Sequence, residues 1–272
     1  MTEPTLHPLW KWTPGAAPLA ATDELAVEEP LEIRVNRRPV SVTMRTPGPA
    51  GQDAELAAGF LFTEALIANR AAVAEFSTRP GVVDVHLAHG VSIDLGRLTR
   101  HVFASSSCGV CGKASIEAIE AHFPPLPAPG VAASQFPAAL FANLPERLRT
   151  AQPTFARTGG LHAAALFDAA GRLLIAREDV GRHNALDKVI GRAFLDGLLP
   201  LDRHVVLLSG RVSFELVQKA LAARIPVLAA VSAPSSLAVE FADSSGLTLI
   251  GFLRDGRMNV YSHPERLAGW TI

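Results

Sequence analysis

Two thiols are the residues of this chain that are best suited to chemistry. Cys108 and Cys111 are the only cysteines among its 272 residues, and they lie in the stretch Ser-Ser-Ser-Cys-Gly-Val-Cys-Gly-Lys at 105–113. Thiols at this spacing bind a metal ion, cycle between dithiol and disulfide, or carry a sulfur atom. The function of the protein depends largely on which of these three uses applies.

A metal site is disfavoured by the supply of ligands. Structural zinc needs about four protein ligands, and the chain has no third cysteine. Zinc deaminases use a His-x-Glu motif, which here would read His162-Ala163-Ala164 and lack the acid/base glutamate. Histidines would have to complete a zinc site, and the candidates, none with the usual paired spacing, are His101, His122 and His162. We therefore expect no metal bound by the protein itself.

The other two uses of the thiols are redox cycling and sulfur transfer. A thioredoxin-like role needs the Cys-x-x-Cys directly after the first strand of a βαβ unit, whereas here it follows a mainly β segment. A helix expected over 113–122 would direct its N-terminal N–H groups and its dipole towards the thiols, and Lys113 adds a positive charge. These features favour the thiolate, which can accept a sulfane sulfur as a persulfide. The residues favour sulfur transfer and leave redox cycling open.

Three loops later in the chain are suited to bind an anion. Each loop follows an expected strand and opens an expected helix, so that free backbone N–H groups point outwards. In open α/β sheets the carboxyl ends of the strands meet at one edge, where ligands bind. We therefore expect phosphate or hydroxyl contacts there, although no Walker or Gly-x-Gly-x-x-Gly motif is present. The loops are 177–188 with Arg182, His183 and Asn184, then 208–213 with Ser209, Gly210 and Arg211, and then 233–236.

The elements that would position these residues follow from apolar periodicity and turn signals. A hairpin is expected at 31–35 and 40–44, a helix at 53–68, and strands at 82–87 and 91–95. After a proline-rich linker at 124–130, a helix at 137–150 precedes a second hairpin at 161–167 and 172–176. Helices at 183–197, 214–224 and 236–242 then alternate with strands at 205–208, 226–231, 247–252 and 257–261. Apolar strands that alternate with helices predict an α/β fold with a mixed sheet covered on both faces.

Composition limits the class of protein. Hydrophobic residues make up 49% of the chain and charged residues 19%, and the net charge is −1. This balance gives no sign of bulk binding to nucleic acid or to membranes. No apolar run reaches the roughly 18 residues of a membrane-spanning helix, and the N-terminus does not resemble a signal peptide. We expect a cytoplasmic protein, in which a stable structural disulfide is disfavoured.

Taken in order, the motifs resemble those of the formate dehydrogenase accessory sulfurtransferase family (FdhD). The resemblance runs from about residue 31 to about residue 267. Each motif alone is weak, but together they are highly specific. The motifs are 45–48 (Arg-Thr-Pro-Gly), 59–64 (Gly-Phe-Leu-Phe-Thr-Glu), 106–112 around the thiols, 158–164, 178–185, 208–211 and 251–257.

The resemblance implies a role in the maturation of formate dehydrogenase. Family members accept sulfur from a cysteine desulfurase and pass it to the molybdenum cofactor, bis(molybdopterin guanine dinucleotide), before this enters apo formate dehydrogenase. It implies that Cys108 carries the persulfide and that Cys111 assists or is a second carrier. The cofactor-contacting stretch near the C-terminus corresponds to Phe252, Leu253, Arg254, Asp255, Gly256 and Arg257.

The resemblance also implies a fold and an assembly. A cytidine-deaminase-like, three-layer core with a mixed sheet is expected over 131–272. It would follow an extended N-terminal segment at 1–30 and a smaller α+β domain at 31–130 that carries the Cys-x-x-Cys loop. The implied assembly is a homodimer. Two alternative functions remain open, a non-catalytic chaperone that binds the cofactor for formate dehydrogenase, and a zinc-dependent hydrolase.

Overall fold

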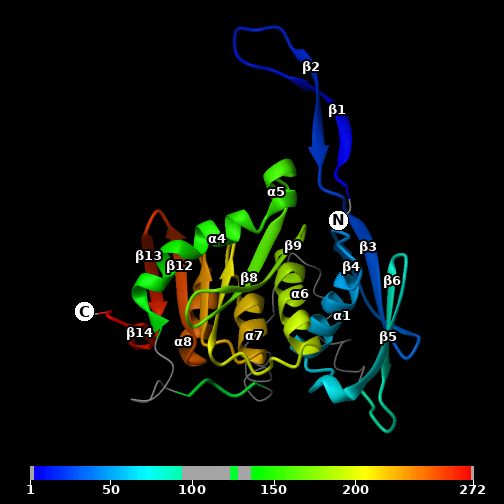
Figure 1. Ribbon diagram of the computed structural model, residues 1–272, viewed down its shortest axis with the longest axis vertical. Coiled ribbons are helices and arrows are strands. Elements are labelled where there is room, and N and C mark those ends of the chain that lie inside the picture. Colours follow the sequence, from blue (N-terminus) through cyan, green and yellow to red (C-terminus); the bar gives the residue numbers. More distant parts are fainter. Residues whose placement is uncertain (1–2, 94–122, 128–135, 271–272) are drawn as a thin grey trace.

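The computed structural model describes residues 3–93, 123–127 and 136–270. It is a mixed α/β structure with a six-stranded sheet, a four-stranded sheet and a projecting two-stranded hairpin (Figure 1). The prediction of a mixed α/β fold is confirmed at this level. Cys108, Cys111 and the helix expected at 113–122 lie outside the described residues.

The six-stranded sheet has the order β13-β12-β11-β10-β8-β9. β10, β11 and β12 are parallel to one another, whereas β8, β9 and β13 pair antiparallel with their neighbours. Every strand expected beyond residue 160 is present. The bounds are β8 His162–Asp168, β9 Leu173–Asp179, β10 His204–Leu208, β11 Val227–Ala230, β12 Thr248–Arg254 and β13 Arg257–Ser262.

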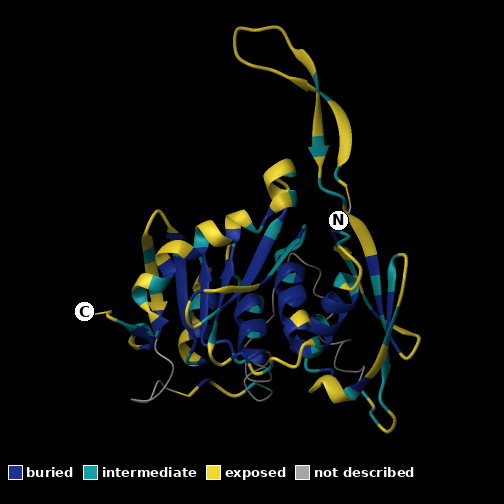
Figure 2. Ribbon diagram, in the orientation of Figure 1, coloured by how far each residue is buried: buried dark blue, intermediate teal, exposed yellow. Residues whose placement is uncertain are grey.

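Helices cover both faces of this sheet. Successive side chains of a strand point to opposite faces, so Val206 and Leu208 pack towards one helical layer and Val205 and Leu207 towards the other. The first layer holds α6 (Arg182–Leu195), α7 (Phe214–Ala222) and α8 (Ser236–Ser244). The second holds η2 (Ala138–Asn143) and α4 (Leu144–Thr150), so the helix expected at 137–150 begins as a 3₁₀ helix. Both interfaces are apolar and buried (Figure 2).

The four-stranded sheet lies at the N-terminal side and has the order β4-β3-β6-β5. The expected hairpin and the strand at 82–87 are present, and β5 is a strand that the sequence pattern did not reveal. Val91–Ile93, expected to begin a strand, form none. The bounds are β3 Glu29–Val35, β4 Arg38–Arg45, η1 Arg70–Ala72, β5 Val73–Arg79 and β6 Val82–Leu87.

Helix α1 (Gln52–Thr63) joins the two sheets because it packs on the four-stranded sheet and on α6. Two glycines allow the helices to touch. A Cβ atom on Gly59 would lie 1.9 Å from the carbonyl oxygen of Asp187, and one on Gly191 would lie 1.8 Å from that of Glu55. The helix ends before the expected residue 68 because the chain turns at Ala65, where φ is 56°.

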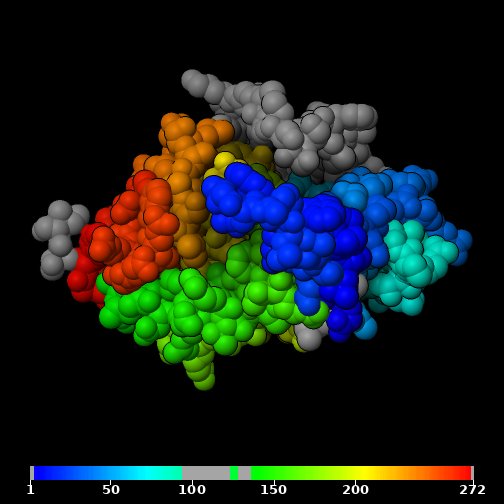
Figure 3. Space-filling model, turned by 90° about the horizontal axis from the view of Figure 1, so that it is seen from above, coloured from blue at the N-terminus to red at the C-terminus, as the bar shows by residue number. Residues whose placement is uncertain are grey.

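Residues 5–25 form an antiparallel hairpin of β1 (Thr5–Lys11) and β2 (Leu19–Leu25), where an extended segment was expected. The hairpin projects from the body of the molecule (Figure 1), and the view from above places it between the two sheets (Figure 3). Its base contacts α5 (Pro153–Thr158), where Arg157 pairs with Glu24 at 2.6 Å.

The remaining elements close the second layer of the core. β7 (Phe136–Pro137) pairs with β14 (Leu267–Ala268), which follows η3 (Pro264–Arg266). From the expected linker, Leu126 is buried and donates its N–H to the carbonyl of Ser245.

None of the helices in the described residues is long and apolar enough to cross a membrane.

Candidate functional site

A cavity of about 1130 Å³ opens where the carboxyl ends of β10, β11 and β12 meet the start of β8. Helices α4 and α5 form its other wall. Six residues named from the sequence line this cavity together, although they come from two loops more than 40 positions apart. They are Ser209, Gly210, Arg211, Arg254, Asp255 and Gly256.

The loop after β10 is fixed by hydrogen bonds to β8. Ser209 donates its N–H to the carbonyl of Ala163 at 2.9 Å, and its Oγ accepts the N–H of Ala163 at 2.8 Å. The hydroxyl therefore extends the strand pairing. A Cβ atom on Gly210 would lie 3.0 Å from His162 Nδ1, so a larger residue would push against this imidazole. Arg211 follows as an exposed cation.

The C-terminal end of β12 contains a bulge that presents Arg254 to the cavity. The pairing of β12 with β13 shifts between Gly251 and Arg254, and Phe252 has a φ of 51°. The N–H of Phe252 donates to Ser232, and the Arg254 guanidinium lies 5.8 Å from the centre of the Phe252 ring. Leu253 is buried in the core. Leu253 therefore anchors the bulge, while its neighbours remain free to meet a ligand.

Arg257, the last residue of the predicted stretch, is exposed on β13 and does not line the cavity. Arg182 and His183, at the start of α6, are partly exposed and do not line the cavity either. Arg182 nevertheless acts on the site through its charge, which lowers the pKa of both His162 and His183.

The two imidazoles beside the cavity are held neutral. Burial lowers the pKa of His183 to about 4, and the charges of Arg182 and Lys219 act in the same direction. Burial, with the charges of Arg182 and Arg211, also lowers the pKa of His162, which lines the cavity. His183 Nε2 shares a hydrogen bond of 3.2 Å with the Ser213 hydroxyl. Positive charge at this edge therefore comes from arginines.

Asn184, predicted from the same loop, is buried away from the cavity. Its Nδ2 donates to the carbonyl of Met44 at 2.7 Å and to Asp179 Oδ1 at 3.0 Å. Its Oδ1 faces the Thr43 hydroxyl at 3.3 Å. The structure therefore gives Asn184 a contact with β4, and its proposed contact with a cofactor stays a prediction.

Asp179 and Lys188 also connect the six-stranded sheet with the segment that follows β4 of the four-stranded sheet. Lys188 Nζ lies 2.6 Å from Asp179 Oδ2, both side chains are fully buried, and the ammonium also donates to the carbonyl of Thr46 at 2.9 Å. Asp179 accepts the N–H of Thr46 as well. This group is called the Asp179–Lys188 lock. It connects two motifs that are more than 130 positions apart.

A second buried group joins α1, α6 and α7. Lys219 Nζ donates to Asp187 Oδ2 and to Thr63 Oγ1, both at 2.9 Å, and lies 3.5 Å from Glu64. Burial raises the pKa of Asp187 to about 6, against the opposing effect of the Lys219 charge. The Gly-Phe-Leu-Phe-Thr-Glu motif at 59–64 thus supplies a helix contact and an ion-pair network.

Sequence reasoning missed the α4 and α5 wall of the cavity. Arg149 adds a third cation to the cavity besides Arg211 and Arg254, and the side chain of Gln152 is almost fully buried there. The Gln152 Nε2 atom is buried without a hydrogen-bond partner among the described residues. These residues carry no motif, and only the tertiary fold brings this wall to the strand ends.

The described residues contain no group of three or more His, Cys, Asp or Glu side chains placed to hold a metal ion. His101 and His122, considered as zinc ligands together with the cysteines, lie outside those residues. The chemistry visible at the cavity is that of a cationic surface at strand ends, which suits a ligand with phosphate groups.

The fold and cavity define an α/β protein with an anion-binding edge, and comparison with known proteins gives its family. Residues 26–268 match the FdhD/NarQ family, and the chain belongs to that family. The family predicted from the sequence motifs is thereby confirmed.

Individual relatives agree with this assignment. The chain is 53% identical over 258 residues to the sulfur carrier protein FdhD of Streptomyces coelicolor, covering 90% of this chain and 89% of that one. It is 53% identical over 260 residues to the protein of the same name from Mycobacterium tuberculosis, covering 90% and 92%. A crystal structure described as a formate dehydrogenase accessory protein, from Desulfotalea psychrophila, superposes with a TM-score of 0.77 at 27% identity, covering 97% and 99%.

Proposed function

We propose that this protein, a sulfur carrier of the FdhD/NarQ family, matures formate dehydrogenase by delivering sulfur to its molybdenum cofactor. The substrate would be bis(molybdopterin guanine dinucleotide), held at the cavity before it enters the apoenzyme. The observation that carries the proposal is the convergence of Arg149, Arg211 and Arg254 on one cavity at the strand ends. Arginine forks match phosphate oxygens, and this substrate carries two diphosphate groups.

Sulfur would enter on Cys108. Its thiolate attacks the outer sulfur of a persulfide on a cysteine desulfurase, so that a new S–S bond forms on Cys108 and the desulfurase thiolate leaves. In the delivery step the Cys111 thiolate attacks the inner sulfur of the Cys108 persulfide. A Cys108–Cys111 disulfide forms, and the outer sulfur leaves as sulfide, which the molybdenum accepts. A cellular thiol then reduces the disulfide, which is consistent with the proposed cytoplasmic location.

The cavity residues would hold the substrate while sulfur is delivered. Arg211 and Arg254 pair with phosphate oxygens, and neutral His162 can exchange a hydrogen bond without adding charge. The Phe252 ring lies within cation–π distance of the Arg254 guanidinium and helps to hold it in place. The predicted contacts of Asp255 and Gly256 belong to the same proposed surface, whereas Arg257 lies outside it on β13.

Intact-mass measurement tests the carrier. The protein is incubated with a cysteine desulfurase and cysteine, and an adduct of one sulfur atom that is lost on reduction is expected. Cys108→Ala should lose the adduct and the ability to activate formate dehydrogenase, whereas Cys111→Ala should keep the adduct. An unchanged adduct in Cys108→Ala, or full activation by the variant that lacks both thiols, would contradict the proposal.

The second candidate is a chaperone that binds the cofactor without carrying sulfur, and the same cavity favours it. The sulfur adduct seen by intact-mass measurement distinguishes the two functions. A chaperone forms no sulfur adduct, yet loses formate dehydrogenase activation when Arg211 and Arg254 are both changed to glutamine. A sulfur carrier shows the adduct in that double variant and fails only at delivery.

We also propose a homodimer and a cytidine-deaminase-like core. The layered six-stranded sheet supports the core assignment. The dimer is supported by the hairpin, since an isolated two-stranded hairpin is marginally stable in water, and this one exposes Leu6, Trp10, Trp12 and Leu19 to between 66% and 73%. Light scattering of the full chain should give twice the monomer mass, and Trp10→Ser with Trp12→Ser should shift it towards the monomer.

A further inference from the structure

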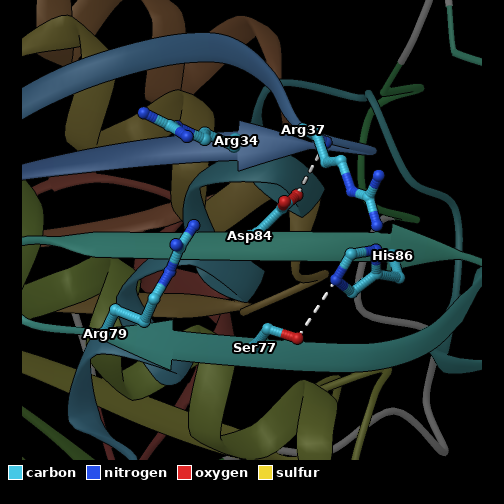
Figure 4. Close-up of a pocket in the computed structure, with 6 residues that line it drawn as sticks. All are labelled: Arg34, Arg37, Ser77, Arg79, Asp84 and His86. Carbon is cyan, nitrogen blue, oxygen red and sulfur yellow. Dashed lines mark hydrogen bonds between the residues drawn. The ribbon is translucent and has the colours of Figure 1, made fainter.

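A second cationic hollow lies far from the strand-end cavity, on the outer face of the four-stranded sheet. Its volume is about 520 Å³. Every lining residue is polar or charged, and none is an aliphatic residue, phenylalanine, tyrosine or tryptophan. The lining residues, drawn in Figure 4, are Arg34, Arg37, Ser77, Arg79, Asp84 and His86.

The alternation of the strands places these side chains on one face. In β3, Leu31, Ile33 and Val35 are buried against α1, so Arg34 points to the opposite face. In β6, Val83 and Val85 are likewise buried in that core, so the side chains between and after them face outwards. Pairing of the strands places Arg34 beside Asp84 and Asp84 beside Ser77.

Hydrogen bonds fix the frame of the hollow. Arg37 lies in the turn between β3 and β4 with a φ of 68°, and its N–H donates to Asp84 Oδ1 at 3.0 Å. The neighbouring Asn36 accepts the N–H of Leu87 through its Oδ1, also at 3.0 Å. His86 Nε2 shares a hydrogen bond of 3.1 Å with the Ser77 hydroxyl. The turn, β6 and β5 are therefore held in one arrangement.

The arginines keep donors free. Within the part of the chain that the structure describes, the guanidinium groups of Arg37 and Arg79 form no hydrogen bond or ion pair. Arg34 pairs with Glu32 through Nε and Nη2 at 2.9 and 2.5 Å, which leaves its third nitrogen. A guanidinium has five N–H donors, so each arginine can still bind an anion.

Charge is distributed towards two ends of the hollow. Arg37 and His86 lie at one end, Arg34 and Arg79 at the other, and Asp84 lies between them (Figure 4). Asp84 is only 4% exposed. A single anion over the centre would be repelled by its carboxylate, whereas an anion with two charged groups would meet arginine at both ends.

We propose that this hollow binds an anion that carries two phosphate groups. Arginine forks match phosphate oxygens bidentately, and the Ser77 hydroxyl and the His86 imidazole offer further polar contacts. Because no large apolar side chain lines the hollow, recognition there would depend on charge and hydrogen bonds. Free pyrophosphate and the diphosphate part of a nucleotide present the same chemistry to this site. The proposal does not depend on sulfur transfer or on the strand-end cavity.

Calorimetric titration of the full chain with inorganic pyrophosphate tests the site. Because the strand-end cavity is also cationic, the titration is performed with Arg211→Gln and Arg254→Gln in place, so that binding there is weakened. In that background, Arg37→Gln and Arg79→Gln should each weaken binding by about tenfold, as expected for loss of a charge-assisted hydrogen bond. Arg38→Gln is the matched control, since Arg38 is exposed at the start of β4, next to the turn, and does not line the hollow.

Titration with pyrophosphate and with guanosine diphosphate distinguishes a free diphosphate ligand from a nucleotide. Equal affinities for pyrophosphate and guanosine diphosphate indicate that the diphosphate alone is recognised, and tighter nucleotide binding that is lost in Arg37→Gln indicates a nucleotide. The proposal is overturned if pyrophosphate fails to bind in this background, or if Arg38→Gln weakens binding as much as Arg37→Gln. It is also overturned if a glutamate-rich peptide binds these arginines more tightly than pyrophosphate. Circular dichroism melts verify that each variant is folded.

Discussion

The strand-end cavity and the buried interface between the two sheets use charged side chains in opposite ways. In the cavity, Arg149, Arg211 and Arg254 are exposed and pair with no carboxylate of the described residues, so their charge is available to a ligand. In the interface, Lys188 and Asp179 neutralise each other in full burial. The cavity arginines therefore serve the site and the buried pair serves the fold, and substitutions should separate the two roles.

The largest effect on stability is expected at the Asp179–Lys188 lock. Lys188→Met leaves the Asp179 carboxylate buried without its cation, and removing one partner of a buried pair costs about 3–5 kcal/mol. Urea unfolding of the full chain measures this loss. Asp179→Asn added to Lys188→Met removes the unpaired charge and should recover part of the stability. A loss below about 1 kcal/mol for Lys188→Met would show that the lock does not stabilise the interface.

The next effect is expected where α1 crosses α6. In Gly191→Ala the new methyl group would meet the carbonyl oxygen of Glu55, and the helices would have to separate. Overpacking of this kind typically costs about 1–3 kcal/mol, and the upper part of that range is expected because the obstacle is backbone. The free energy of unfolding in urea measures it.

Gly197→Ala provides the matched control for the helix crossing. Gly197 follows the same helix, has a φ of 69°, and has no atom within 4 Å of the position of a Cβ. It should lose only about 1 kcal/mol, from backbone strain alone. Equal losses for the two variants would argue against close helix contact.

A third effect depends on pH and lies at the border of the two regions. His183 has a folded-state pKa of about 4, lowered by burial, and an unfolded-state pKa near 6.5. Between these values the unfolded chain binds the extra proton, so stability is complete above about pH 6.5 and falls as the pH drops towards 4. The expected loss between pH 7.5 and pH 5 is about 1–2 kcal/mol.

His183→Gln isolates this contribution. The variant should lose less stability than the parent between pH 7.5 and pH 5, as measured by urea unfolding at each pH. At pH 8 the imidazole is neutral in both the folded and the unfolded parent protein. The difference in unfolding free energy between parent and variant at that pH therefore reports the loss of the Ser213 contact and not a protonation effect. The same pH dependence in both proteins would mean that the His183 imidazole is not desolvated in the fold.

Much of the fold could be predicted from the sequence because its signals are local. The apolar strands and the helices after residue 160 are regular, and each appears within a few residues of its expected position. β5 was missed because Val73–Arg79 mixes exposed and half-buried residues without alternation. The N-terminal hairpin was missed because the apolar residues of β1 and β2 are mostly exposed and show no buried face.

The site was predictable only where it follows strand ends. Ser209–Arg211 and Arg254–Gly256 could be named from their position after apolar strands and from the family motif. Arg149 and Gln152 could not, because their helical turn reaches the cavity only through tertiary packing. Asn184 shows the opposite error, because it was predicted to be in the site but contacts β4 instead. A loop before a helix indicates free backbone N–H groups, but it does not show whether the side chains of the loop already bond to a neighbouring sheet.

The smallest effect on stability, and a large effect on function, is expected in the cavity. Arg254→Gln removes an exposed guanidinium whose described contact is the Phe252 ring, so the free energy of unfolding should change by less than about 0.5 kcal/mol. Formate dehydrogenase activation should nevertheless fall about tenfold, as expected for loss of a charge-assisted phosphate contact. Arg257→Gln, an exposed neighbour outside the cavity, is the matched control and should retain activation. If Arg254→Gln instead destabilises the fold as much as Lys188→Met while activation by the remaining folded protein is normal, then Arg254 belongs with the interface and the division between the two regions fails.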